Sequence, residues 1–216
     1  LCLNGIAMGY GATGTISGNT VTGHTRGAPW AAVGIYVYVS DGITVTGNTV
    51  ENCFYGVMLD EADSCTVSGN TLTNTIKRGI SLDTANSNII SANTISGPAV
   101  GTFDTAIGLA ENCADNTIGG ITLTAGNTII MAASGTGNLY AIHIQGNVGA
   151  GANSISCNTI TGGQRAIQLD GPPGATGKTT ISNNTISGQA FGGIIANNTG
   201  DFDIVDNTLT NTVRPM

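Results

Sequence analysis

Charged residues are scarce in this sequence. They make up 9% of its 216 residues, only six of them are Lys or Arg, and the formal net charge is −7. A nucleic-acid groove needs a run of basic side chains to neutralise phosphates, and so does attachment to an anionic membrane surface. The composition therefore argues against both kinds of partner.

The sequence also lacks a long apolar run. Its longest candidate, residues 31–39, has the length of a buried strand. A membrane-spanning helix needs roughly 20 apolar residues, so we expect no membrane insertion. Apolar residues still make up 40% of the chain and recur regularly, which excludes a disordered protein.

Cysteine occurs five times, but never in the Cys-x-x-Cys spacing typical of zinc sites. Cys65 and Cys113 occupy apolar slots of expected strands. The first interpretation is therefore that the thiols are free and buried, packing as small hydrophobic groups. A disulfide between Cys53 and Cys65, which would close one repeat, is left open by the sequence.

What the chain has instead is a triplet of Asn, Thr and an aliphatic residue that recurs from end to end. Before each triplet stands a second motif, a small residue followed by a short apolar strand. In five of the eight cases the small residue precedes the Asn by 14 positions, as Gly56 precedes Asn70. The triplets begin at Asn19, Asn48, Asn70, Asn93, Asn127, Asn158, Asn184 and Asn207.

Repeats of 22 to 35 residues with short strands and no heptads are typical of a solenoid. In one repeat, the two-residue period of a strand places Val57 and Leu59 inward and Gly56 and Asp60 outward. Two further strands complete the coil. The sequence therefore predicts an all-β fold, a single parallel β-helix domain over residues 1–216 with about eight coils.

The aliphatic residue three positions before each Asn is expected to lie in the core. These residues should form one buried stack along the axis. Its predicted members are Ile16, Val45, Val67, Ile90, Ile155, Ile181 and Ile204.

The recurring Asn has a structural explanation. A tight bend leaves backbone N–H and C=O groups unpaired beside the core, and each such group costs about 1–3 kcal/mol. An Asn amide carries both a donor and an acceptor, so stacked Asn side chains can pair with the bends above and below. We expect a ladder of eight Asn residues with no catalytic role.

The sequence motifs of the strands and turns resemble those of right-handed parallel β-helix proteins, the class of pectate-lyase-like, carbohydrate-binding and sugar-hydrolase β-helices. Motifs of the type Gly-Ile-x-Leu and Ile-x-Gly-Asn-Thr-Ile carry the resemblance over nearly the whole chain. The resemblance implies a scaffold that hosts lyases, hydrolases, epimerases, adhesins and inert stalks. Lyases of this class use aspartates, calcium and a basic residue.

The repeat is already running at Gly5 and continues almost to the last residue. Neither end carries an amphipathic helix that would cover the open strand edges, and open edges pair with other strands. We expect a piece of a longer secreted or cell-surface protein, with further repeats or other chains at the open ends of the β-helix.

The outward face of the Gly-Ile-x-Leu strands is the first candidate site. Stacking places Asp60 and Asp83 on successive coils, about 5 Å apart, with Glu111 near them. Such a pair is a weak candidate for binding Ca²⁺ or sharing a proton in acid–base catalysis, and otherwise no cofactor is expected. Arg78 and Arg165 begin their strands, where a guanidinium could hold a uronate or act beside the acids.

Aromatic residues form a second candidate site. Trp30, Tyr36 and Tyr38 lie close together in the sequence, although only 5% of the residues are aromatic. An aromatic platform beside amides and acids can bind sugar rings, and several of these rings could equally cap the core. The candidate substrate-binding residues are Trp30, Tyr36, Tyr38, Asp60, Asp83, Glu111, His143 and Arg165; the catalytic candidates are Asp60, Asp83 and Arg78.

Threonines form a third candidate surface. Outward Thr and Ser pairs recur in two arrays. One array runs along all eight coils and includes Thr71 with Thr73, and the other has six pairs, including Thr122 with Thr124 in the fifth coil. Such grids resemble those of ice-binding solenoids, although Thr is also a common polar residue of any solvated β face. Glu51 and Ile130 interrupt the grid.

Three function hypotheses follow. The first is a structural or carbohydrate-binding module that contacts polysaccharide. The second is a polysaccharide lyase or glycoside hydrolase acting in a groove on the β-helix. The third is an ice-binding protein. An enzyme requires convergent polar groups in one place, whereas a binding module requires only aromatic and amide side chains on one face.

Overall fold

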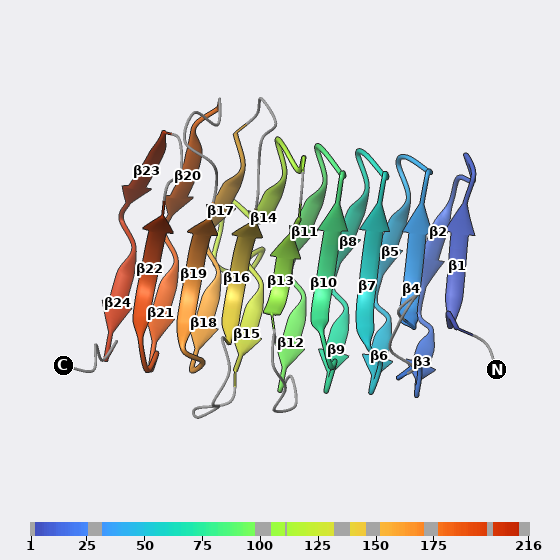
Figure 1. Cartoon of the computed structure of the whole chain (residues 1–216), viewed down its shortest axis with the longest axis horizontal. Coiled ribbons are helices and arrows are strands. Elements are labelled where there is room, and N and C mark those ends of the chain that lie inside the picture. The colour runs from blue at the N-terminus through green and yellow to red at the C-terminus, as the bar shows by residue number, and fades with distance from the viewer. Residues whose placement is uncertain are drawn as a thin grey trace.

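The computed structural model describes residues 3–25, 32–97, 105–110, 112–131, 139–145, 152–170, 177–197 and 201–211. These residues form strands, turns and bends, and there is no helix among them. Accordingly, this part of the chain contains no helix long and apolar enough to cross a membrane. The strands wind coil after coil along one axis, as Figure 1 shows.

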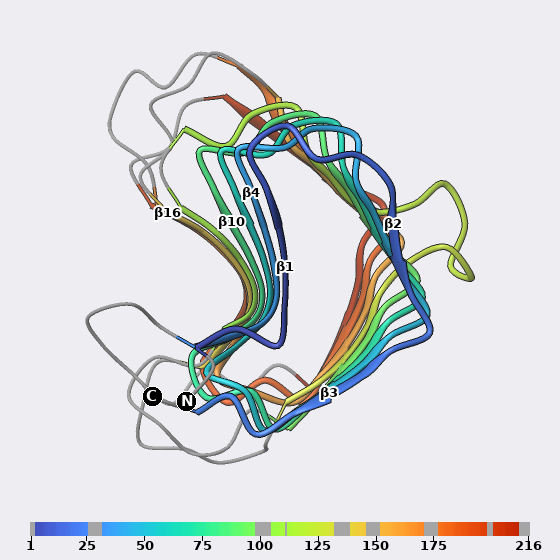
Figure 2. The same cartoon turned by 90° about the vertical axis from the view of Figure 1, so that its right-hand side faces the viewer.

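The first of three parallel sheets has the longest strands and a concave outer face. Its strands bow toward the interior of the coil when the molecule is viewed along its axis (Figure 2). Each strand pairs with the equivalent strand of the next coil. The strands are β1 (Ile6–Gly9), β4 (Val33–Tyr38), β7 (Tyr55–Asp60), β10 (Arg78–Asp83), β13 (Thr105–Leu109), β16 (Tyr140–Gln145), β19 (Arg165–Asp170) and β22 (Gly192–Asn197).

The second and third sheets have mostly three-residue strands, and each sheet also contains eight strands. The second sheet contains β2 (Thr15–Ser17), β5 (Thr44–Thr46), β8 (Thr66–Ser68), β11 (Ile89–Ser91), β14 (Thr117–Gly119), β17 (Ser154–Ser156), β20 (Thr179–Ser182) and β23 (Phe202–Val205). The third contains β3 (Thr20–Thr22), β6 (Thr49–Glu51), β9 (Thr71–Thr73), β12 (Thr94–Ser96), β15 (Thr128–Ile130), β18 (Thr159–Thr161), β21 (Thr185–Ser187) and β24 (Thr208–Thr210). The all-β solenoid expected from the repeat is confirmed.

Aliphatic side chains from all three sheets fill the interior of the coil. Six members of the predicted stack are buried, from Ile16 to Ile181. Ile118 pairs with Ile90 and Ile155 and fills the place of the fifth coil in the same stack. The prediction is wrong for Ile204, which is 47% exposed because no described coil follows it.

The small residue at the start of each first-sheet strand points inward, so the expectation that Gly56 points outward is wrong. A Cβ built at Gly34 would lie 2.5 Å from Val50 Cγ1, which belongs to the third sheet. In the fifth coil Ala106 and Ile107 are both fully buried. Two successive residues thus face the core, because the first sheet approaches the third sheet closely at this corner.

The Asn ladder is confirmed. Asn70 is fully buried, its Nδ2 donates to Asn93 Oδ1 at 3.0 Å, and its Oδ1 accepts from Asn48 Nδ2 at 2.9 Å. The same Nδ2 also donates to the Val45 carbonyl at 2.9 Å. Each Asn between the first and the last of the ladder therefore ties its own bend to the coils on both sides.

The sequence analysis missed a second ladder, at the entrance to the second sheet. Asn88 donates from its backbone N–H to Asn116 Oδ1 at 2.9 Å, and Asn116 donates in the same way to Asn153 at 3.0 Å. All three side chains are buried. They directly precede strands β11, β14 and β17, so the signal was an Asn before each of these strands.

The placement of Thr122 and Thr124 in the second-sheet array is wrong. Residues 120–126 form a turn between β14 and β15 that projects from the coil, visible as the yellow-green loop in Figure 2. Ile121 at its tip is 97% exposed. Thr117 and Gly119 occupy the array positions instead, because this insertion lengthens the distance from the strand to Asn127.

The described cysteines Cys53, Cys65, Cys113 and Cys157 are free and buried. The disulfide left open between Cys53 and Cys65 is therefore absent from the structure. Burial raises the pKa of the Cys113 thiol to about 11, so this group stays protonated and packs as an apolar side chain.

Candidate functional site

The outer face of the first sheet carries the side-chain columns that the repeat predicted. His143 pairs in register with Gly108 and Gln168, and Asp83 pairs with Asp60. The face divides into an aromatic and acidic end on the earlier coils and a basic end on the later coils.

The aromatic and acidic end is centred on Tyr36. Its ring stacks on Tyr38 with centroids 5.1 Å apart, and its hydroxyl donates to Asp60 Oδ2 at 2.5 Å. Burial, and then the hydrogen bond and charge of Asp60, raise the pKa of Tyr36 well above its usual value. Tyr36 therefore acts as a hydrogen-bond donor that holds the Asp60 carboxylate.

Asp60 and Asp83 are neighbours in register, as expected, but the rest of the predicted acidic site is not assembled around them. Trp30 and Glu111 lie outside the described residues. No group of three or more His, Cys, Asp or Glu side chains in the described ranges is arranged to hold a metal ion.

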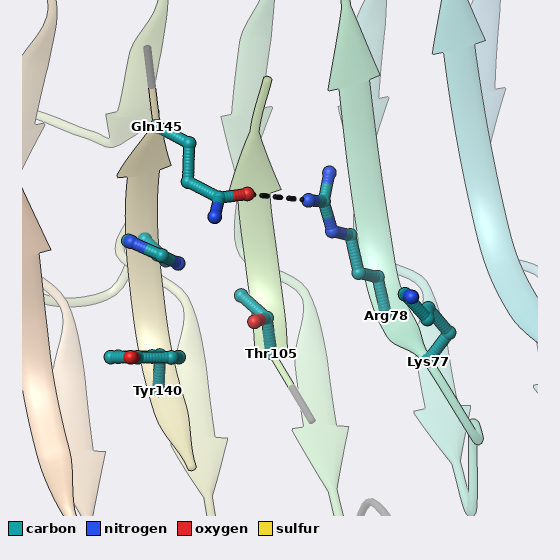
Figure 3. Close-up of a pocket in the computed structure, with 6 residues that line it drawn as sticks. Lys77, Arg78, Thr105, Tyr140 and Gln145 are labelled. Atoms are coloured by element: carbon teal, nitrogen blue, oxygen red, sulfur yellow. Dashed lines mark hydrogen bonds between the residues drawn. The ribbon is translucent and has the colours of Figure 1, made fainter. Parts of the chain in front are cut away.

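The basic end surrounds a cavity of about 210 Å³ on the outer face of β10, β13 and β16. Figure 3 shows Arg78, Thr105, Tyr140 and Gln145 projecting on the same side of these strands. The lining residues are Lys77, Arg78, Thr105, Tyr140, His143 and Gln145. Two of the six Lys and Arg residues of the sequence therefore line one cavity.

Arg78 crosses the sheet because of a glycine. Its Nη2 donates to Gln145 Oε1 at 2.9 Å, two strands away, and its Nη1 donates to Ser81 Oγ at 3.0 Å. A Cβ built at Gly108, on the intervening strand, would lie 2.9 Å from Arg78 Cδ and Nε. Gly108 thus leaves the space through which Arg78 reaches the later coils.

Tyr140 lines the cavity at the basic end. Its ring stacks on the His143 imidazole with centroids 4.2 Å apart and an interplanar angle of 24°. The Arg165 guanidinium lies 5.3 Å from the Tyr140 centroid and 4.4 Å from that of Phe191. Cation–π contacts of this kind hold a guanidinium in place while its charge is retained.

Asp170 orders the far side of this group. Its Oδ2 lies 2.8 Å from His143 Nε2 and accepts from Gln168 Nε2 at 2.6 Å, while its Oδ1 accepts from Asn197 Nδ2 at 3.0 Å. Burial acts to raise the pKa of Asp170, but the donors from Asn197, His143 and Gln168 outweigh it, and the net pKa is lowered. The carboxylate is therefore ionised.

The pKa of His143 is also lowered, but here burial is the largest cause. Burial lowers the pKa of the imidazole, and the nearby charges of Arg78 and Arg165 act in the same direction. The hydrogen bond and charge of Asp170 work against this shift without cancelling it. His143 is 6% exposed and is neutral at neutral pH.

The structure brings together Arg78, His143 and Arg165 of the predicted site residues, and it places Tyr36, Tyr38, Asp60 and Asp83 at the other end of the face. The sequence analysis missed Tyr140 and Asp170 as site residues. The signal for Tyr140 was its position, because it begins its strand as Arg78 and Arg165 begin theirs. The signal for Asp170 was its place one coil after Gln145 and diagonally across from His143.

The threonine surface is on the third sheet. Thr71, Thr94 and Thr128 pair in register, and the column extends over all eight strands. Glu51 and Ile130 interrupt the neighbouring column at the expected places. The register is confirmed, and ice binding stays a prediction.

Comparison with known proteins identifies the family. The sequence profile described as "Right handed beta helix region" matches residues 1–123 and 33–209, two overlapping stretches that together span most of the chain. This chain belongs to that family. No curated protein sequence matches the chain.

Solved structures of similar fold include carbohydrate-active enzymes. An exopolygalacturonase from Thermotoga maritima is 12% identical with a TM-score of 0.52, and the match covers 83% of this chain and 42% of the enzyme. An alginate lyase from Paenibacillus sp. is 14% identical with a TM-score of 0.51, over 98% and 90% of the two chains. A DFA-IIIase from Arthrobacter chlorophenolicus is 12% identical with a TM-score of 0.47, over 84% and 55%.

At such low identity these matches show the fold alone. The chain spans less than half the length of the exopolygalacturonase and slightly more than half of the DFA-IIIase. The right-handed parallel β-helix that the resemblance implied is nevertheless confirmed by the family match.

Proposed function

We propose that this protein binds an acidic polysaccharide along the concave face of its first sheet. The observation that carries the proposal is the gathering of cations in a chain with a net charge of −7. Lys77 and Arg78 line one cavity with Tyr140, and the Arg165 guanidinium lies 5.3 Å from the centroid of the Tyr140 ring. A neutral glycan gives no reason to concentrate scarce positive charge in one place.

The ligand chemistry follows from the side chains. An Arg guanidinium pairs with a carboxylate through two parallel hydrogen bonds, and Tyr140 offers an aromatic face to a sugar ring. A polymer of uronic acids carries both features on every residue. Successive coils lie about 4.8 Å apart, so a sugar chain along the axis would pass from this end toward Tyr36 and Asp60.

We propose that the protein is secreted or displayed at the cell surface. A protein that binds such a polymer meets it outside the cytoplasm, in secreted form or at the cell surface. A purely structural role stays the alternative, and it predicts no affinity for any polysaccharide.

Calorimetric titration tests the proposal. Polygalacturonate and alginate are the acidic ligands, and a neutral oligosaccharide such as cellohexaose is the comparison. We expect binding to one of the acidic polymers, weakened by added salt, and none to the neutral sugar. Arg78→Ala and Arg165→Ala should each weaken binding by about tenfold or more, the effect of one charged hydrogen bond.

Lys178→Gln is the matched control. Lys178 is a half-exposed cation, is not among the residues that line the cavity, and pairs with Asp203 at 2.7 Å. Lys178→Gln changes the net charge by the same one unit as each Arg variant. Unchanged affinity in Lys178→Gln would therefore show that the losses in the Arg variants come from their place at the cavity and not from the change in net charge. Equal losses in all three variants, or no binding to either acidic polymer, would contradict the proposal.

A further inference from the structure

The His143 imidazole is held in a way that binding alone does not require. It lies between the Tyr140 ring and the Asp170 carboxylate, nearly buried, and it lines the cavity beside Arg78. A group that only contacts a sugar does not need a carboxylate that fixes the orientation of its ring. An imidazole oriented by a carboxylate is the arrangement of a general base.

The hydrogen bond to Asp170 fixes the tautomer. Because Asp170 is ionised and can only accept, Nε2 of the neutral imidazole carries the hydrogen and donates it. The lone pair is then on Nδ1, the ring nitrogen that does not contact Asp170. Asp170 is in turn fixed by Gln168 and Asn197, so the ring cannot rotate without breaking this network.

The protonation state suits a base. The charged and titratable groups around His143 are Asp170 and Arg165 on β19, Tyr140 on its own strand and Arg78 from β10, and Lys77 lines the same cavity. Burial together with the two guanidinium groups keeps the imidazole neutral, while Asp170 stabilises the imidazolium once a proton has been taken. The same guanidinium groups can neutralise a substrate carboxylate.

We infer that the site is catalytic and that His143 is the base of a β-elimination that cleaves a uronate polymer. This inference rests on the proposed binding function. Nδ1 of His143 removes the proton at C5, whose acidity rises when an Arg neutralises the adjoining carboxylate. The C5 electron pair forms the C4=C5 double bond, the C4–O4 bond breaks, and the departing O4 takes up the proton that His143 has removed.

Elimination fits the described residues better than hydrolysis. Hydrolysis of a glycosidic bond uses two carboxyl groups on either side of that bond. Near His143 the only described carboxylate is Asp170, and three donors occupy it. Asp83 lies two strands away, about 10 Å along the axis.

The experiment measures binding and cleavage on the same preparations. Wild-type protein is incubated with polygalacturonate and with alginate, and the ultraviolet absorbance of the new double bond is followed. His143→Gln should lower the rate by about 10²–10⁴-fold with affinity nearly unchanged. Asp170→Asn should lower the rate and move the acid limb of its pH profile, as expected of a positioning residue, and Lys178→Gln should change neither.

Circular dichroism and melting of the variants establish that they fold. The wild-type pH profile gives a second measurement that needs no variant: the rate should fall with decreasing pH below the ordinary histidine pKa of 6.5, as His143 takes up a proton. A pH-independent rate through that range would overturn the assignment of the base.

The two proposals fail separately. Binding without unsaturated products, cleavage that yields only hydrolysis products, or full elimination activity in His143→Gln would overturn the catalytic inference and leave the binding function standing. Absence of binding to both polymers would overturn both.

Discussion

Single residues at the bends hold this fold together. The side chain of Asn70 pairs with three other residues of the neighbouring coils, whereas Thr71 beside it points to solvent. The two positions differ by one place in the sequence, so they form a natural pair for testing what the ladder contributes.

Asn70→Ala should destabilise the protein far more than Thr71→Ala. The substitution leaves the Asn48 N–H and the Val45 carbonyl unpaired in the core, at about 1–3 kcal/mol for each group. Removing the exposed Thr71 hydroxyl should change the free energy of unfolding by about 0.5 kcal/mol or less. Denaturant unfolding of the two variants measures both, and equal midpoints would show that the ladder bonds add no stability.

His143 should make stability depend on pH. Its pKa is lowered in the folded state, so below pH 6.5 the unfolded chain binds the proton more readily than the folded chain. The contribution of the neutral imidazole is therefore fully present above pH 6.5 and is lost as the pH falls toward the folded pKa. Unfolding of wild type and His143→Gln between pH 8 and pH 5 should give a flatter curve for the variant; parallel curves would contradict the lowered pKa.

At the scale of the strand, the inward small residue decides how the site is built. Because two successive residues face the core at the start of each first-sheet strand, the residue before them projects outward. This shift places Arg78, Tyr140 and Arg165 on the same face as His143. A strictly alternating strand would have turned these three side chains toward the core.

Gly34→Ala tests this corner. The added methyl group would overlap Val50 Cγ1 and the Gly56 carbonyl oxygen, 2.5 and 2.8 Å from the new Cβ. We expect a loss of about 1–3 kcal/mol in the free energy of unfolding, the usual effect of overpacking. Thr44→Ala, on the outward face of β5, is the control and should be nearly neutral. A melting temperature equal to that of wild type would mean that the sheets can separate at this corner.

At the scale of the whole molecule, stability should vary along the axis. Each coil contacts only its neighbours. The backbone amides of a coil with a neighbour on both sides therefore become exposed to solvent only when a larger part of the solenoid opens. The residues of β24 are all exposed, whereas Ile80, Leu82 and Ile90 of the middle coils are fully buried.

Amide hydrogen exchange should follow this gradient. Amides of β10 and β11 should exchange more slowly than those of β23 and β24 by on the order of 10³-fold or more. Mass spectrometry of peptides from the exchanging protein measures the ratio, with β7 and β8 as an internal check that neighbouring middle coils behave alike. Uniform protection along the chain would indicate that the solenoid opens as one unit.

The sequence by itself determined the solenoid, the strand register and the Asn70 ladder. Each of these follows from a local rule that repeats: strand periodicity, a tight bend and an amide that satisfies it. The columns that contain Asp60, Asp83 and His143 could be written down from the repeat spacing alone. Where an insertion broke the spacing, as between Gly119 and Asn127, the same rule gave the wrong strand.

Only the tertiary structure decided how the site is assembled. That Gly56 faces the core, that Arg78 crosses Gly108, and that Asp170 lies behind His143 depend on the close approach of one sheet to another and on diagonal contacts between coils. Side chains several strands apart meet because the coils stack about 4.8 Å apart and long side chains reach across that spacing. A repeat pattern shows which residues occupy equivalent positions in successive coils. Which of their side chains contact one another depends on how the coils pack.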